Sequence, residues 1–228
     1  MTQQKYIKRS LEPVIKKAAG EFPVVVLTGP RQSGKTTLLK HLFGHKYTYV
    51  SLESPDIRAA AGADPRGFIE MYEPPVIFDE VQYASDLLLY IKEKVDAARD
   101  IAGQYLLTGS QNILLLQSVT ESLAGRSAML KLMPLARREA LGALTLRLPW
   151  ESGKSRIVDK PLSQKELWRG FLRGGYPELV AHPDRDYSIW QSTYVQTYLG
   201  AISGSFARSA IWGSFRIFCG LLLRAAAS

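Results

Sequence analysis

Apolar positions along the 228-residue chain predict strands that alternate with helices. Short apolar or β-branched runs, typical of buried strands, are followed by segments in which apolar residues recur every three or four positions, typical of amphipathic helices. The predicted strands are 24–27, 47–52, 76–78, 104–108 and 128–132. This alternation predicts an α/β fold with a parallel sheet that is covered by helices on both faces.

The predicted helices lie between and after these strands. Pro13 interrupts the first, so its first half is expected to be separate, and Gly20 is expected to end it. Gly109 and Ser110 are expected to turn the chain after the fourth strand. The predicted helical ranges are 6–19, 55–61, 64–71, 87–98, 113–123, 136–141, 163–172 and 187–199, with a further helix after residue 36 that Gly44 should end.

Changes in composition divide the chain into three regions. Residues 1–148 carry the alternating pattern and form the expected α/β core with its N-terminal helix. Residues 149–199 form a helical extension, either lid-like or a linker, whose first part, 151–161, is polar and irregular. Residues 200–228 contain no acidic residue, are rich in Gly, Ser and Ala, and form an atypical tail.

Charge and cysteine content limit the partners and the metal chemistry that this chain could have. The formal charge is +8, from 29 basic and 21 acidic residues. This balance favours nucleoside phosphates, nucleic acid or acidic surfaces as partners, but no long Lys/Arg run supports nucleic-acid binding. A single cysteine, Cys219, excludes an intrachain disulfide and a thiolate metal cluster. Without an apolar signal core or a clean apolar stretch of membrane-spanning length, we expect no membrane association and a cytoplasmic location.

The strongest motif is Gly29-Pro-Arg-Gln-Ser-Gly-Lys-Thr36, which fits the phosphate-binding pattern G-x-x-x-x-G-K-[ST]. It follows an apolar strand and precedes a helix, so its backbone N–H groups and the positive helix end face one anion. Lys35 is long enough to reach the β- and γ-phosphates, and Thr36 can bind Mg²⁺ through its hydroxyl. The residues expected to bind nucleotide here are Gly29, Pro30, Arg31, Gln32, Ser33, Gly34, Lys35, Thr36 and Thr37.

A pair of carboxylates, Asp79 and Glu80, ends the predicted strand 76–78. Beside a phosphate loop, the first acid of such a pair holds Mg²⁺. The second acid is suited to act as the general base that activates water. We therefore expect Asp79 to bind the metal and Glu80 to be catalytic.

Two weaker features complete the candidate site. The fourth strand ends in the small polar residues Thr108, Ser110, Gln111 and Asn112, which could place a hydroxyl or amide between the phosphate loop and the carboxylates, or form a polar turn with a helix cap at Ser110 or Asn112. Arg126 could face a γ-phosphate, in cis or from a neighbouring subunit, or could be a solvated arginine after Gly125.

Taken together, the motifs resemble a prokaryotic family of AAA-type P-loop ATPases that carries an uncharacterised C-terminal domain, often likened to a nuclease fold. The resemblance spans about residues 6–199 and implies an additional-strand ATPase core with sheet order 5-1-4-3-2. It also implies ATP, Mg²⁺ and a sensor role for Ser110 or Gln111. The segments that carry it are 27–38, 78–83, 106–111, 122–126, 133–135 and 174–178.

After residue 199 the sequence departs from the family, which continues with a charged helix and the C-terminal domain. The abrupt change in composition predicts a frameshift or a premature end. About half of the family's architecture would then be missing.

The expected function is Mg-dependent ATP binding with ATP hydrolysis, in a chain that could form a homo-oligomer. Three alternatives remain. The first is a regulatory module that binds ATP with negligible turnover, and the second is a nucleotide-regulated nucleic-acid-binding protein. The third, a nucleotide kinase, is disfavoured because Asp79 and Glu80 form a hydrolase arrangement and no acceptor site is evident.

Overall fold

The computed structural model describes residues 6–110, 119, 121–144 and 163–206. The chain forms two compact units. The first contains Met1–Ser155 together with Gly175–Glu178, and the second contains Arg156–Gly174 and Leu179–Ser228.

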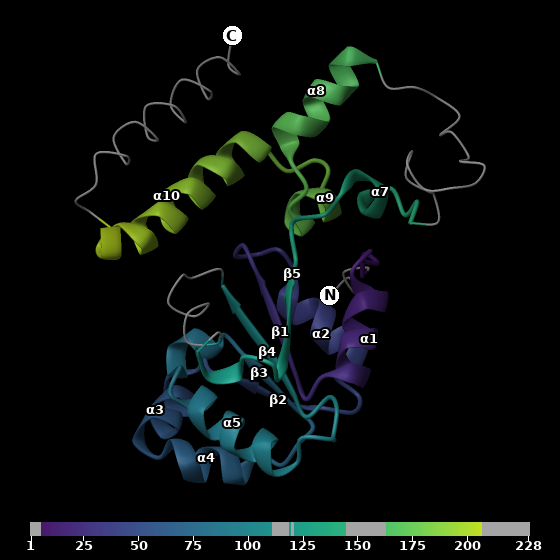
Figure 1. Ribbon diagram of the computed structural model, residues 1–228. Coiled ribbons are helices and arrows are strands. Elements are labelled where there is room, and N and C mark those ends of the chain that lie inside the picture. The colour runs from purple at the N-terminus through teal and green to yellow at the C-terminus, as the bar shows by residue number, and fades with distance from the viewer. Residues whose placement is uncertain (1–5, 111–118, 120, 145–162, 207–228) are drawn as a thin grey trace. The chain divides into compact units, whose positions relative to one another are not determined.

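A parallel sheet forms the centre of the first unit (Figure 1). Its order is β2-β3-β4-β1-β5, so the predicted α/β class and the order 5-1-4-3-2 are confirmed. Every strand pair in the described sheet is parallel, as expected when helices connect the strands. The strands are β1 (Val24–Gly29), β2 (Thr48–Ser51), β3 (Val76–Asp79), β4 (Tyr105–Ser110) and β5 (Ser127–Lys131).

Helices cover both faces of this sheet because successive side chains of a strand point to opposite sides. In β1, Val25 and Leu27 pack in one cluster with residues of α1 (Glu12–Glu21) and α2 (Lys35–Phe43). Val24 and Val26 belong to the opposite cluster, with residues of α3 (Pro55–Ala63), α4 (Pro65–Met71) and α5 (Leu87–Ala97). The fully buried β1 therefore carries no alternation of polar residues.

Two expectations about element ends are wrong. Gly20 lies inside α1, which ends at Glu21 because Phe22 precedes Pro23 and adopts an extended conformation. Gly109 and Ser110 continue β4 instead of turning the chain, since they pair with Thr28 and Gly29 of β1. The structure does place Pro13 in the first turn of α1, where proline is tolerated, so residues 6–11 precede the helix.

The remaining described elements are short or belong to the second unit. They are η1 (Val81–Ala84), α7 (Arg137–Ala140), α8 (Gln164–Arg173), α9 (Pro177–Ala181) and α10 (Tyr187–Phe206). The helix α10 extends beyond its predicted end at residue 199. Most of the predicted helix 113–123 and residues 207–228 of the tail lie outside the described residues.

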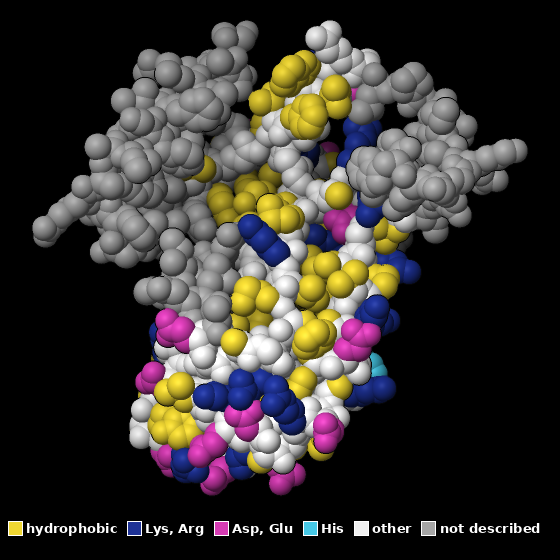
Figure 2. Space-filling view, in the orientation of Figure 1, with side chains coloured by type: hydrophobic (Ala, Val, Ile, Leu, Met, Phe, Trp, Pro, Cys, Tyr) yellow, Lys and Arg dark blue, Asp and Glu magenta, His cyan; other side chains and the backbone are white. Residues whose placement is uncertain are grey.

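In the second unit, α8 begins with a capping box. The Ser163 hydroxyl accepts a hydrogen bond from the Glu166 N–H at 3.3 Å, and the Glu166 carboxylate accepts one from the Ser163 N–H at 2.9 Å. Hydrophobic side chains gather over this helix (Figure 2). Leu167, Trp168, Phe171 and Leu172 are 40–67% exposed.

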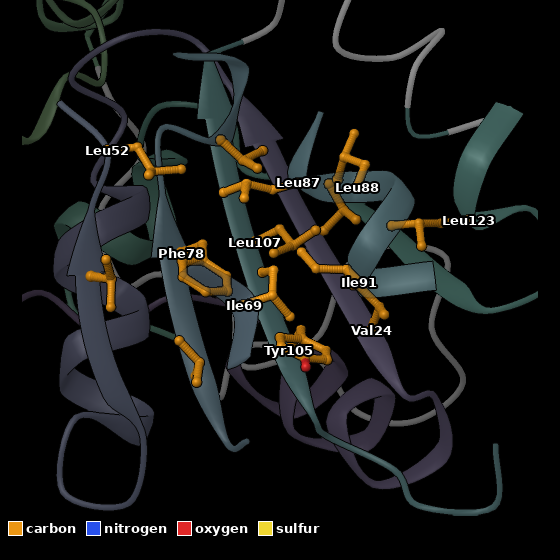
Figure 3. Packing of buried hydrophobic residues seen from close by; sticks show 14 of the residues in the cluster. Val24, Leu52, Ile69, Phe78, Leu87, Leu88, Ile91, Tyr105, Leu107 and Leu123 are labelled. Atoms are coloured by element: carbon orange, nitrogen blue, oxygen red, sulfur yellow. The ribbon is translucent and has the colours of Figure 1, made fainter. Parts of the chain in front are cut away.

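Aliphatic side chains form most of the core between the sheet and the α3–α5 layer, with several aromatic rings packed among them (Figure 3). The Phe78 ring of β3 is fully buried. Its centroid lies 6.1 Å from those of Phe68 and Tyr72 and 6.2 Å from that of Tyr105. These separations fall in the range in which aromatic pairs attract each other.

The change Phe78→Ala should lower the free energy of unfolding by about 3–5 kcal/mol, because it removes buried surface and leaves a cavity among these rings. Urea denaturation of the purified protein measures the loss. The matched control is Leu89→Ala on α5, where the side chain is 59% exposed. The control should change stability by less than about 0.5 kcal/mol, and equal losses in the two variants would contradict the assigned core.

Candidate functional site

The candidate site lies at the edge of the sheet where the parallel strands end at their carboxyl termini. The phosphate loop (residues 29–36) follows β1, and Asp79 and Glu80 lie at the end of β3. The register pairs Phe78 with Leu107, so the next residues, Asp79 and Thr108, are neighbours. In parallel α/β sheets, this edge is where ligands bind.

The phosphate loop has the backbone of an anion-binding turn. Gln32 and Gly34 adopt positive φ angles of 59° and 93°, and α2 starts directly afterwards at Lys35. The first turn of α2 receives no cap from its N-cap residue, Gly34, which has no side chain. Its N–H groups are thus available to an acceptor outside the helix, which favours a bound anion.

Gly29 allows the start of the phosphate loop to pack closely against the segment that follows β5. Its φ angle is 151°, and a Cβ atom at this position would overlap the carbonyl oxygen of Leu132. The Leu132 N–H donates a hydrogen bond of 2.8 Å to the Thr28 carbonyl. The close approach is therefore between two backbones, which no side-chain rotation can relieve.

Lys35 is buried with its ammonium folded over the loop. It is 4% exposed, and Nζ donates to the carbonyl oxygens of Pro30 at 3.1 Å and Gly29 at 3.3 Å. Burial lowers the pKa of Lys35, while the carboxylates of Glu80 and Asp79 oppose this shift. The ammonium is held by neutral carbonyl acceptors, which a charged phosphate oxygen could replace.

Asp79 accepts hydrogen bonds from three hydroxyl groups on three elements. Thr36 Oγ1 donates to its two carboxylate oxygens at 3.0 and 2.9 Å, and the Tyr49 hydroxyl donates at 2.7 Å. The third donor is the Thr108 hydroxyl of β4. These donors supply hydrogen bonds to a carboxylate that is only 4% exposed.

Glu80 adopts a left-handed backbone conformation, with φ 57° and ψ 49°, which is uncommon for a residue with a side chain. Its N–H donates to the Thr108 hydroxyl at 3.2 Å. Its carboxylate accepts bonds from the N–H and hydroxyl of Ser110, both at 3.3 Å, and from the Gln82 amide. Such backbone conformations cluster at functional sites.

The structure brings most of the predicted site residues together, but not Arg126. Arg126 directly precedes β5, so it lies at the end of the sheet where the strands begin. The phosphate loop lies at the other end, one strand length or roughly 17 Å away. Its guanidinium binds the Asp96 carboxylate, with Nη2 2.9 Å from Oδ2. This position offers no contact with a nucleotide in cis, and a role from a neighbouring subunit stays a prediction.

The other predicted residues are distributed as follows. Pro30, Arg31, Gln32 and Ser33 lie within the loop, Thr37 is exposed in the first turn of α2, and Ser110 ends β4 beside Glu80. Gln111 and Asn112 lie outside the described residues. Of the two described polar candidates at the end of β4, Thr108 contacts Asp79 and Ser110 contacts Glu80.

Sequence reasoning missed Tyr49 and Gln82. The register of β2 and β3 pairs Tyr49 with Ile77 and Ser51 with Asp79, so Tyr49 lies on the same face as Asp79, two residues before its level. A tyrosine is long enough to span that offset. The available signal in the sequence was the alternation of side chains along β2, which places every second residue on the same face. It identifies Tyr49 as a site residue only once β2 is known to pair with β3.

The parallel α/β fold, with a phosphate loop directly after β1, is that of the P-loop NTPases. The chain belongs to the AAA domain family, whose model matches residues 21–141. A solved structure, the Walker-type ATPase PABY2304 of Pyrococcus abyssi, superposes with a TM-score of 0.51 at 17% identity, covering 89% of this chain and 75% of the other. At this identity, the likeness establishes the fold.

Two curated relatives are similar over most of the chain. They are the uncharacterised proteins Mb2031c of Mycobacterium bovis and Rv2008c of Mycobacterium tuberculosis. Each is 30% identical over 194 residues, or 84% of this chain, but the match covers 38% of the relative. Within the described part of the chain, no helix combines the length and apolarity needed to cross a membrane.

Gly29→Ala should lower the free energy of unfolding by about 1–3 kcal/mol, because the added methyl group collides with the Leu132 carbonyl. Thermal and urea unfolding without nucleotide measure the change. Gly62→Ala is the control, since Gly62 lies in α3 with no atom within 4 Å of the added Cβ. The control should be neutral or gain up to about 1 kcal/mol, and a stable Gly29→Ala protein would contradict the close backbone approach.

Proposed function

We propose that this chain binds Mg-ATP at the phosphate loop and hydrolyses it. The observation that carries the proposal is the contact between Thr36 and Asp79. These residues come from two motifs 43 positions apart, yet the hydroxyl and the carboxylate lie within 3.0 Å. Membership of the AAA domain family supports the same class of activity.

The residues of the site suit both ATP and Mg²⁺. The uncapped first turn of α2 supports phosphate binding, as does Ser33, which is fully buried and whose hydroxyl lacks a hydrogen-bond partner among the described residues. Thr36 and Asp79 present the hydroxyl and carboxylate oxygens that Mg²⁺ prefers. When bound, the metal would neutralise negative charge on the β- and γ-phosphates.

In the proposed reaction, Lys35 exchanges the carbonyls of Gly29 and Pro30 for phosphate oxygens. Glu80 accepts the proton of the attacking water, and Ser110 orients the Glu80 carboxylate through its N–H and hydroxyl. Thr108 links the Glu80 backbone to the Asp79 side chain. Besides this proton transfer, catalysis then consists mostly of positioning and electrostatic stabilisation.

Two alternative functions, an ATP-binding module and a nucleic-acid-binding protein, differ from an ATPase in what can be measured. A module with negligible turnover would bind ATP but release no phosphate in steady state. Nucleic-acid binding has weaker support, since Lys and Arg side chains are interspersed with Asp and Glu over the face formed by α3, α4 and α5 (Figure 2). The homo-oligomer and the nuclease-like domain stay predictions, on which no contact between described residues bears.

Lys35→Ala should abolish measurable ATP and ADP binding in isothermal titration calorimetry, because it removes the cation that reaches the β- and γ-phosphates. Lys46→Ala, which changes an exposed lysine shortly after α2, should bind as the wild type does. Unchanged ATP affinity in the Lys35 variant would remove the basis for a phosphate site here.

Glu80→Gln should retain ATP binding and lose turnover by about 10²-fold or more, since an amide cannot accept the proton. Steady-state phosphate release, measured with and without Mg²⁺, tests this and separates an ATPase from a binding module. Glu70→Gln, an exposed carboxylate on α4, is the control. Full turnover in Glu80→Gln would assign the general base to another group.

A further inference from the structure

Arg9 lies just before α1 and is buried behind the phosphate loop. Its side chain is 5% exposed. Nη1 donates a hydrogen bond of 2.9 Å to the Ser33 carbonyl, within the phosphate loop, and Nη2 donates one of 2.6 Å to the Met133 carbonyl. One guanidinium thus joins the N-terminal segment, the phosphate loop and the segment after β5.

Glu139 of α7 balances the charge of Arg9. Its carboxylate lies 3.4 Å from Arg9 Nε, and both side chains are almost fully buried. Burial raises the pKa of Glu139, but N–H donors from Ser10 and Ala136 and the charge of Arg9 bring it below its usual value. Glu139 is therefore an anion at neutral pH, and Arg9 is not an uncompensated buried charge.

The hydrogen bond from Arg9 to the Ser33 carbonyl sets the orientation of the Ser33–Gly34 peptide plane. A trans peptide directs its C=O and its N–H in opposite directions. With the Ser33 carbonyl facing the guanidinium, the Gly34 N–H faces away from Arg9. Arg9 Nη1 also lies 3.7 Å from the position that a Cβ atom of Gly34 would occupy, so the guanidinium contacts this peptide directly.

From these contacts we infer that Arg9 is a positioning residue of the nucleotide site: it fixes the Ser33–Gly34 peptide so that the Gly34 N–H faces the bound phosphate. The inference rests on the function proposed above. A purely structural ion pair would require only Glu139. Arg9 instead directs both Nη atoms to backbone carbonyls, and charged donors make the stronger hydrogen bonds.

Three variants separate positioning from folding. Arg9→Met keeps an unbranched side chain without the donors, Arg9→Lys keeps the charge opposite Glu139 but cannot bond two carbonyls in the same fork geometry, and Glu139→Gln keeps both carbonyl contacts but loses the ion pair. ADP affinity in the presence of Mg²⁺, measured by calorimetry, avoids any dependence on turnover. The melting temperature without nucleotide reports on folding alone.

Arg9→Met should bind ADP about tenfold more weakly or worse, and Arg9→Lys should lie between it and the wild type. Glu139→Gln should melt at a lower temperature but bind ADP within about twofold of the wild type, because the Ser33 contact remains. The Gly34 amide resonance of Arg9→Met, without nucleotide, should shift from its wild-type position.

Wild-type ADP affinity in both Arg9 variants would overturn the inference and leave the proposed function intact. If Arg9→Met does not fold, Arg9→Lys decides the question in the same way. An equal loss of ADP affinity in Glu139→Gln and in the Arg9 variants would show that Arg9 only stabilises the fold. A wild-type chain that binds no ADP would instead overturn the proposed function, and this role with it.

Discussion

The parallel register of β3, β4 and β1 is the constraint on which the site depends. Phe78 pairs with Leu107 and Gly29 with Ser110, so the groups that follow these strands meet at one edge. A shift of one residue would turn every side chain of a strand to the opposite face. The register is held because β1 and β3 are buried on both faces, by the two clusters that the helices complete.

Burying the charged groups of the site at the end of this sheet costs free energy. Lys35 and Asp79 are each 4% exposed, and burial of an ion is unfavourable unless hydrogen bonds replace those to water. Three hydroxyl donors satisfy Asp79, and two loop carbonyls satisfy Lys35. Asp79 and Lys35 therefore both have hydrogen-bond partners within the protein, whereas the buried Ser33 hydroxyl has none among the described residues.

The sequence was sufficient to predict the fold and the two main motifs. Strand and helix patterns predicted the α/β class, the resemblance implied the strand order, and the two motifs predicted that Thr36 and Asp79 lie at one metal site. Tyr49 and Arg9 were not predicted because their roles depend on pairing between distant segments: Tyr49 through the β2–β3 register, Arg9 through contacts 24 and 124 positions away. Element ends were misjudged at Gly20 and Gly109, where a neighbouring proline and a partner strand outweigh the local preference of glycine.

The assignment of Gly175–Glu178 to the first unit has a consequence for how the protein can be divided. The Leu135 N–H donates a hydrogen bond of 2.6 Å to the Gly175 carbonyl, and a Cγ atom of Pro177 lies 3.6 Å from the Cβ position of Gly34. The unit that contains the phosphate loop is thus discontinuous along the polypeptide. A fragment cut at Ser155 would lack the short stretch that lies against its own loop, so excising the ATPase core requires residues through Glu178 to be kept or grafted back.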